Sequence, residues 1–399
     1  MISVLEATQL IEKFSPIYPS KKLATALCSE HILRENICAE RENPPFHRIA
    51  MDGIAINFQS YLDGKRSFLI EGIQAAGHEP LELKNLENCF EAMTGGVLPH
   101  HCDCVIPIER LSVENGVASL ETGLELSQWQ NIHKHGSDHA AGFLLAEEGI
   151  RLKVPDIAVA AAAGYGFLDV SKTPSIAIIA TGDELVGPDE ELKAWQIRRS
   201  NTVAILAGLN AAGFTKSNEY HLKDDEAELE RKLAELLEQN DMLILTGGVS
   251  MGKFDFVPRV LEKLGVNKVF HKVAQRPGKP LWFGVKGQKT VFGLPGNPVS
   301  AVINFQRYIL PQLQKSSACL PQKQIPLAVL TKDFKFSKKM TRFLPVTTYF
   351  DANSRLCATP KETNGSGDFG ALSGSDGFLE LEAETDLFPE AYSAPFYTW

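Results

Sequence analysis

The pattern of apolar and polar residues changes character along the chain. Between residues 175 and 313, short apolar segments alternate with amphipathic helical patterns. This alternation predicts a doubly wound α/β domain with a mostly parallel sheet. The expected strands are residues 175–180, 219–222, 241–245, 269–274, 281–285 and 290–294, and the expected helices are residues 201–212, 225–238, 256–264 and 298–310.

The segments on either side of this region have a different texture. Residues 28–145 and 325–399 contain short alternating runs broken by Gly, Pro and Asn, which is typical of mainly β domains. At the N-terminus, Ser3 and Glu6 match a capping box before a helical stripe of apolar residues. Residues 156–164 also have a helical pattern, so we expect the two helical segments to pack together.

These patterns predict a multidomain protein that combines an α/β domain with β domains. The expected domains are a discontinuous helical domain (residues 1–27 and 146–173), an inserted mainly β domain (residues 28–145), the α/β domain (residues 174–316) and a C-terminal β domain (residues 317–399).

Composition restricts the class of protein further. A chain of 399 residues is too long for one ordinary core, and 44% hydrophobic residues is typical of a globular protein. The net charge of −9 argues against nonspecific binding to nucleic acid or to a membrane surface. Seven cysteines without a paired CxxC spacing indicate reduced thiols in a cytoplasmic protein. We expect no signal peptide and no membrane-spanning segment.

The segment TGGVSMGKFDF, residues 246–256, carries the most specific chemistry. It follows the apolar segment 242–245 and precedes a helix. Gly247 and Gly248 would let the backbone approach an anion closely, and the helix N-terminus would add positive partial charge. Asp255 would place a carboxylate beside that anion. An ordinary strand-to-helix turn, which also favours glycine, remains the alternative.

Three other segments follow predicted strands in the same way. Because the carboxyl ends of parallel strands share one edge of a sheet, we expect all four segments to converge on one crevice. A mixture of amide donors, cations and acids suits a phosphate-bearing ligand held with a divalent metal. The three segments are residues 179–185 with Asp183 and Glu184, residues 274–280 with Arg276 and Lys279, and residues 292–302 with the turn Pro295-Gly296 before Asn297.

Further polar candidates have strong structural alternatives. Asp52 precedes Gly53, Asp138 follows Gly136 by two residues, and Thr94 precedes two glycines. Taken singly, each is more typical of a turn residue than of a ligand contact. Asp224 lies where the N-cap of the helix at residues 225–238 belongs.

Together, the motifs resemble those of one known family. AMDG, MTGG-x-x-P, TGDEL, Ser200-Asn201, Asp224-Asp225, TGGVSMG, PGKP and LPGNPVSA occur in this order across nearly the whole chain. This combination resembles the molybdopterin molybdenumtransferase family, called MoeA in bacteria and the gephyrin E-domain in animals. Arg342 and the segment NGSGDF resemble a partly degraded form of the family's C-terminal β-barrel domain.

The resemblance implies an activity, cofactors and partners. The activity is insertion of molybdate into adenylylated molybdopterin with Mg²⁺, which releases AMP. The implied assembly is a homodimer whose cleft lies between the α/β domain of one subunit and the inserted β domain of the other. A molybdopterin adenylyltransferase would act immediately upstream.

The resemblance also assigns roles to single residues. The family's essential acids fall on Asp52, Asp138, Glu184, Asp224 and Asp255, and its threonine falls on Thr94. Asp52, Glu184 and Asp255 are the implied metal ligands. The implied molybdopterin-binding residues are Thr181, Gly182, Asp183, Ser200, Asn201, Gly247, Gly248, Ser250, Arg276, Pro277, Gly278, Lys279, Pro295, Gly296, Asn297 and Pro298.

Some positions depart from the family pattern, and they keep two other functions open. The departures are His47, Arg48, Ile49, Ile54, His133, Ser137, Arg199 and Arg276. Most of them lie in the inserted β domain. A divergent paralogue could bind molybdopterin as a carrier or scaffold without efficient metal insertion. A nucleotide-cleaving enzyme that shares the α/β domain is the third alternative.

Overall fold

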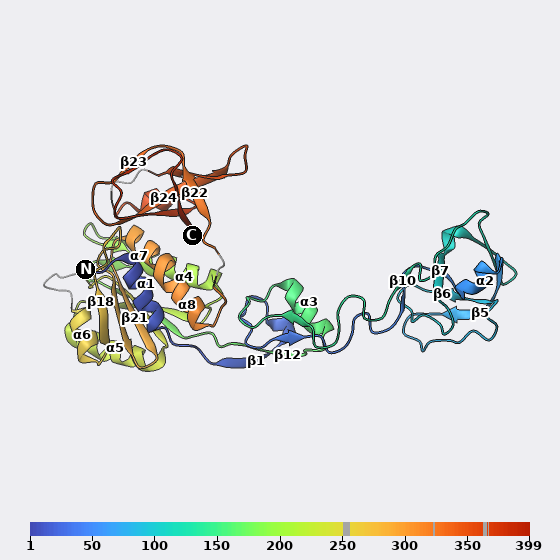
Figure 1. Ribbon diagram of the computed structural model, residues 1–399. Coiled ribbons are helices and arrows are strands. Elements are labelled where there is room, and N and C mark those ends of the chain that lie inside the picture. The colour runs from blue at the N-terminus through green and yellow to red at the C-terminus, as the bar shows by residue number, and fades with distance from the viewer. Residues whose placement is uncertain (250–255, 322–323, 362–364, 366) are drawn as a thin grey trace. The chain divides into compact units, whose positions relative to one another are not determined.

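The computed structural model describes residues 1–249, 256–321, 324–361, 365 and 367–399. The chain, drawn in Figure 1, forms two compact units. The first unit comprises Met1–Glu35, Glu148–Lys153 and Phe167–Trp399. The second unit comprises Asn36–Glu147 and Val154–Gly166.

A six-stranded sheet forms the centre of the first unit. Its strand order is β16-β13-β17-β21-β20-β18; the first four strands are parallel, and β20 and β18 each run antiparallel to the preceding strand. This agrees with the mostly parallel sheet expected from the sequence. The bounds are β13 (Ile176–Thr181), β16 (Ser217–Leu222), β17 (Met242–Thr246), β18 (Asn267–His271), β20 (Trp282–Lys286) and β21 (Lys289–Leu294).

Helices cover both faces of this sheet, as the alternation of its buried residues requires. Ile176 and Ile178 face one hydrophobic cluster, whereas Ala177 and Ile179 face the other. The expected last helix is longer than predicted and contains a π-helical turn, η3. The helices are α4 (Asn201–Ala211), α5 (Glu226–Gln239), α6 (Val257–Lys263), and α7 (Pro298–Asn304), which continues through η3 (Phe305–Ile309) into α8 (Leu310–Ser316).

The N-terminal helix corrects one expectation. Helix α1 (Val4–Lys13) begins at the predicted capping box, where Ser3 and Glu6 exchange hydrogen bonds. Its buried residues join the same core as η3. Helix α1 therefore packs on the α/β layer rather than forming a helical domain with residues 156–164. The latter region forms α3 (Val154–Ala162), which belongs to the second unit.

The C-terminal region forms a closed five-stranded barrel with its own hydrophobic core. Strands pair in the order β24-β25-β22-β28-β26, and β26 pairs back with β24. Closure leaves no open edge in this ring of strands. The bounds are β22 (Leu327–Leu330), β24 (Thr341–Phe350), β25 (Leu356–Pro360), β26 (Gly377–Leu381) and β28 (Ser393–Thr398), with the short pair β23 (Phe334–Lys335) and β27 (Leu387–Phe388) beside them.

The second unit is built around another six-stranded sheet, in the order β7-β4-β6-β5-β9-β8. Strand β4 is buried along its whole length because it lies between β7 and β6 and is covered on both faces. The bounds are β4 (Gly53–Ile56), β5 (Ser67–Gln74), β6 (Cys89–Ala92), β7 (Cys104–Pro107), β8 (Leu111–Glu114), β9 (Val117–Leu120) and helix α2 (Phe58–Leu62), with β3 (Arg48–Ile49) pairing β10 (Ile132–His133). Among the described residues, no helix is long and apolar enough to span a bilayer.

Candidate active site

The parallel strands of the first unit end on one edge, and hydrogen bonds join the loops that follow them. The Gly247 amide donates to the Leu294 carbonyl at 3.2 Å. Asn201, the first residue of α4, donates through Nδ2 to Thr246 Oγ1 and to the Gly296 carbonyl, each at 2.8 Å. The ends of β17 and β21 and the start of α4 are therefore directly connected.

The end of β13 joins the same edge. The Gly182 amide donates to the Leu222 carbonyl at 3.4 Å, and His221 Nε2 lies 2.9 Å from the Gly182 carbonyl oxygen. A Cβ atom on Gly247 would lie only 2.6 Å from the Thr181 carbonyl oxygen. The expected convergence of the strand-end segments is thus present in this part of the chain.

The paired glycines have a clear structural requirement. Gly247 and Gly248 have φ angles of 89° and 63°, and a Cβ on Gly248 would lie 2.7 Å from Thr181 Oγ1. Side chains would collide with β13 at both positions. Ser250 and Asp255, the other predicted residues of this segment, lie outside the described residues.

The acids at this edge separate into different roles. Asp225, not Asp224, caps α5, because its Oδ1 accepts a first-turn amide at 2.8 Å. Asp224 instead donates its backbone amide to Asp183 Oδ1 at 3.4 Å. Both carboxylate oxygens of Glu184 lie within 2.8 Å of the position that a Cβ on Gly182 would take. The carboxylates of Asp183 and Glu184 therefore both stand at the end of β13, and Asp183 contacts the segment that follows the neighbouring strand β16.

A cavity of about 720 Å³ lies between residues 275–280 and the C-terminal barrel. Pro295 and Asn297 extend its lining to the end of β21 and the start of α7. We call residues 275–279 the cation loop. Within the described part of the chain, no Asp or Glu side chain lines this cavity. Its charged lining residues are Arg276, Lys279, Lys335, Lys338 and Arg342.

Two of these cations are neighbours on paired strands. The short strand β19 (Gln275–Arg276) pairs in parallel with β24, and Arg276 is in register with Arg342. Burial, and then the charge of Arg276, lowers the pKa of Arg342 to about 10. Its Nε is buried and has no hydrogen-bond partner among the described residues, while its guanidinium lies 5.5 Å from the Phe336 ring centre. Two adjacent guanidinium groups of this kind favour an anionic ligand that contacts both.

Three lining cations from the C-terminal region, Lys335, Lys338 and Arg342, were absent from the site predicted by sequence. Lys335, Lys338 and Arg342 belong to residues 331–342, which contain five basic residues and one acidic residue. That local charge excess is the signal that could have identified them. Their proximity to the cation loop depends on the pairing of β19 with β24, which brings together residues that are more than fifty positions apart in the chain.

Two other predicted residues contribute buried atoms near the strand ends. Thr181 Oγ1 and Asn201 Oδ1 are buried and have no hydrogen-bond partner in the part of the chain that is described. Ser200 occupies the N-cap position of α4 without a side-chain capping bond, and Pro298 is the first residue of α7.

In the second unit, the structure brings together two predicted residues that are 42 positions apart. The backbone amide and the hydroxyl of Thr94 both donate to Asp52 Oδ1 at 2.7 Å. These two hydrogen bonds, the backbone one first, lower the pKa of Asp52. Asp52 is thus an exposed carboxylate that is held ionised and oriented by Thr94.

Asp138 also belongs to the second unit, where it accepts a hydrogen bond from Asn43 Nδ2 at 2.8 Å. One departure from the family pattern, His47, also belongs to the second unit and contacts His135. His47 Nδ1 accepts the backbone amide of His135 at 3.1 Å, and His135 Nε2 lies 2.9 Å from Glu42 Oε2. Burial, and then neighbouring His135, lowers the pKa of His47.

The predicted metal ligands are divided between different parts of the chain. Asp52 belongs to the second unit, Glu184 to the first, and Asp255 lies outside the described residues. Across the described ranges, no group of three His, Cys, Asp or Glu side chains is arranged to hold a metal ion.

Comparisons with known proteins match this architecture along nearly the whole chain. Residues 2–164 match the MoeA N-terminal region (domains I and II), residues 177–315 match a probable molybdopterin binding domain, and residues 327–390 match the MoeA C-terminal region (domain IV). The crystal structure of a molybdopterin biosynthesis MoeA protein from Pyrococcus horikosii is similar over 100% of this chain and 99% of that chain, with 26% identity and a TM-score of 0.83.

Curated relatives show the same full-length similarity. The molybdopterin molybdenumtransferase of Synechocystis sp. is 36% identical over 401 residues, which cover 100% of both chains. The molybdopterin molybdenumtransferase of Bacillus subtilis is 30% identical over 392 residues, which cover 96% of this chain and 91% of the relative. The multidomain arrangement, the strand-end motifs and these similarities show that the chain belongs to the molybdopterin molybdenumtransferase (MoeA) family.

Proposed function

We propose that this protein inserts molybdate into adenylylated molybdopterin and releases AMP, the last step of molybdenum cofactor biosynthesis. The observation that carries the proposal is the cavity lined by Arg276, Lys279 and Arg342, in a chain whose net charge is −9. An anionic ligand must be attracted by a local concentration of positive charge in such a protein.

The cavity suits oxyanions in particular. Each guanidinium offers several donors in a plane, which matches the oxygens of molybdate or of a phosphate. Arg342 has a buried Nε–H without a partner among the described residues, so a bound oxygen would satisfy it. In this proposal Arg276, Lys279 and Arg342 bind and orient the oxyanion, and the strand-end glycines accommodate the molybdopterin side.

Asp52 and Asp138 would act on the side of the reacting groups that faces away from Arg276, Lys279 and Arg342. Asp52, kept ionised by Thr94, would orient substrate groups together with Asp138. Because these acids and the cation loop belong to different compact units, we propose a homodimer in which the second unit of one subunit completes the cleft of the other. Electrostatic positioning of this kind is an efficient source of catalysis.

Carboxylate oxygens are the ligands that Mg²⁺ prefers, and Asp183 and Glu184 place such oxygens at the ends of the parallel strands. We propose that Glu184, Asp52 and Asp255 hold Mg²⁺. When bound, the ion would neutralise charge on the pyrophosphate group of the substrate. A molybdopterin adenylyltransferase would supply that substrate, and we place the reaction in the cytoplasm.

The activity is tested with purified protein, adenylylated molybdopterin, Mg²⁺ and molybdate. AMP release that depends on molybdate supports the proposal. Binding of the substrate without release indicates the carrier or scaffold function instead. AMP release that proceeds equally without molybdate indicates a nucleotide-cleaving enzyme.

The shared cleft is tested by mixing two inactive variants, Asp52→Ala and Lys279→Ala. Subunit exchange should restore roughly a quarter of wild-type activity, because mixed dimers would contain one cleft with both native residues. Demonstrated exchange without any recovery contradicts the shared cleft.

A further inference from the structure

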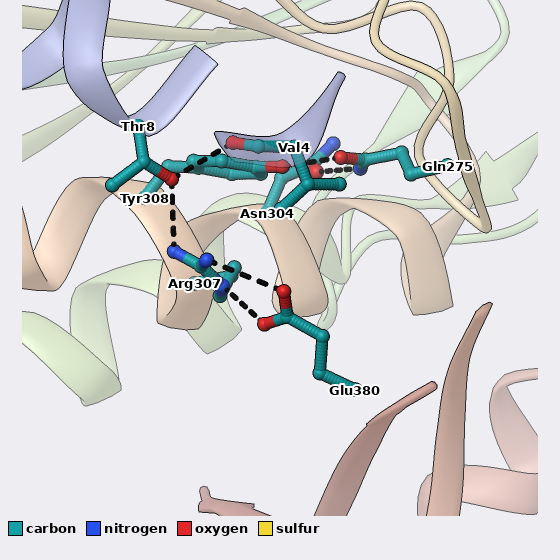
Figure 2. A network of polar contacts seen from close by, with 7 residues as sticks. All are labelled: Val4, Thr8, Gln275, Asn304, Arg307, Tyr308 and Glu380. Atoms are coloured by element: carbon teal, nitrogen blue, oxygen red, sulfur yellow. Dashed lines mark hydrogen bonds and ion pairs between the residues drawn. The ribbon is translucent and has the colours of Figure 1, made fainter. Parts of the chain in front are cut away.

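Three buried polar side chains, one of the cation loop and two of the helical segment 298–316, form a hydrogen-bonded chain. Gln275 and Asn304 are fully buried, and Tyr308 is 2% exposed. Tyr308 donates its hydroxyl to Gln275 Oε1, Gln275 Nε2 donates to Asn304 Oδ1 at 2.7 Å, and Asn304 Nδ2 donates to the Gly278 carbonyl at 3.3 Å. Figure 2 shows Tyr308 and Asn304 reaching Gln275 from the helical segment. We call this chain of donors the amide relay.

The direction of the amide relay follows from the loop carbonyls. Gln275 Nε2 also donates to the Pro277 carbonyl at 3.2 Å. Because carbonyl oxygens only accept, the NH₂ groups of Gln275 and Asn304 must both face the loop backbone. Gln275 Oε1 then needs a donor of its own, which Tyr308 supplies; burial raises the pKa of Tyr308, so the hydroxyl keeps its proton.

The loop backbone is closely packed against the two amides. Gly278 has a φ of 89°, and a Cβ at this position would lie 2.7 Å from both Asn304 Oδ1 and Gln275 Nε2. Pro277 and Gly278 are the two residues between Arg276 and Lys279. Their backbone conformation therefore determines where the two cations project into the cavity.

The residue next to Tyr308 anchors the same helical turn. Arg307 donates to Glu380 of β26 through Nε at 2.7 Å and Nη2 at 3.4 Å, and through Nη1 to Thr8 Oγ1 of α1 at 3.2 Å (Figure 2). Burial opposes the charge of Arg307, but Glu380 more than offsets this, and the pKa of Arg307 is raised. The π-helical turn η3 thus links strand β26 of the barrel, through Arg307, to the cation loop, through Tyr308. Departures from regular helix of this kind are frequent at functional sites.

We infer that Gln275, Asn304 and Tyr308 are positioning residues that set the geometry of Arg276 and Lys279 for oxyanion capture, an inference that rests on the proposed function. The relay holds the carbonyls of Pro277 and Gly278 by hydrogen bonds from buried side chains. Small displacements of binding groups have large effects on capture, because several hydrogen bonds must form at once.

The inference is tested first with Tyr308→Phe and Asn304→Asp. Tyr308→Phe keeps the packed ring and removes the donor to Gln275, so the amide is free to turn. Asn304→Asp keeps the acceptor for Gln275 and removes the donor to Gly278. We expect the molybdate Kd from calorimetry to rise about five- to a hundredfold, the range for a buried partner left unsatisfied. The KM for molybdate should rise similarly, while kcat at saturating molybdate changes less than twofold.

A matched control separates positioning from stability. Gln312 is also a buried amide on this helical segment, but it donates to Ser316 within the same helix at 2.8 Å. Gln312→Met should lower the melting temperature by an amount comparable to Tyr308→Phe and leave the molybdate Kd unchanged. Equal weakening of molybdate binding by Gln312→Met would mean that the effect is global and would refute the inference.

Arg276→Ala shows whether a negative result refutes the positioning role of the amide relay or the proposed oxyanion site itself. If Arg276→Ala abolishes molybdate binding while both relay variants bind like the wild type, the relay has no positioning role and the cavity remains the oxyanion site. If Arg276→Ala leaves molybdate binding intact, the cavity is not the oxyanion site and the proposed function of its cations is wrong.

Discussion

Arg342 offers the sharpest test of whether the cavity is built for an anion. Its guanidinium is partly buried beside Arg276 and has no carboxylate among the lining residues that are described. A structural arginine would be expected to stabilise the fold, whereas an arginine held for a ligand should destabilise the ligand-free protein. The substitution Arg342→Met removes the charge and keeps most of the side-chain volume.

The magnitude follows from the electrostatics of the folded state. Burial and Arg276 lower the pKa of Arg342 to about 10, which corresponds to roughly 3 kcal/mol of unfavourable free energy for the charged form. Because the folded-state pKa lies below that of the unfolded chain, this penalty is fully present at neutral pH. It fades only as the pH rises above about 10. Loss of contacts with the Phe334 and Phe336 rings would cost about 1 kcal/mol.

The net expectation is that Arg342→Met stabilises the anion-free protein by about 1 to 2 kcal/mol, or raises the melting temperature by a few degrees. Molybdate at about 100 times its Kd should stabilise the wild type by about 2.7 kcal/mol and the variant much less. Thermal unfolding in anion-free buffer and in molybdate measures both effects.

Lys339→Met is the matched control, because Lys339 belongs to the same basic segment but does not line the cavity. It should leave the molybdate-induced shift unchanged. A variant Arg342→Met that is less stable than the wild type without anions, and that keeps the full molybdate-induced shift, would show that Arg342 is structural and that this reasoning is wrong.

Two further predictions concern single contacts. Thr94→Val removes the hydroxyl donor to Asp52 and keeps the backbone donor, so the pKa of Asp52 should rise. In a plot of the AMP-release rate against pH, the rise on the acidic side should therefore move to higher pH. An unchanged acidic side would exclude Asp52 as the titrating group. Gly278→Ala and Gly287→Ala both place a side chain at positive φ, but only the first would collide with the amide relay. Calorimetry should therefore show weaker molybdate binding for Gly278→Ala alone, whereas equal binding by both would argue against close packing of the loop.

The local pattern of the sequence determined the secondary structure of the α/β layer and the start of the N-terminal helix. Alternation of buried residues identified the α/β layer, and the capping box of Ser3 and Glu6 placed the start of α1 correctly. The strand-end segments were expected to converge because parallel strands share an edge, and the contacts of Gly247 with Leu294 and Thr181 confirm this for the segments after β13, β17 and β21. Such features depend on short-range sterics and hydrogen bonds, which a few neighbouring residues specify.

Other features depended on contacts between distant parts of the chain. The apolar stripe of α1 predicted a helix but not its packing partner. In the structure, the buried residues of α1 join the hydrophobic cluster on one face of the α/β sheet. Likewise, nothing local to Arg342 indicates that it faces Arg276, because the pairing of β19 with β24 results from docking the barrel on the α/β layer. Long-range packing, rather than local pattern, therefore placed the cations of the candidate site.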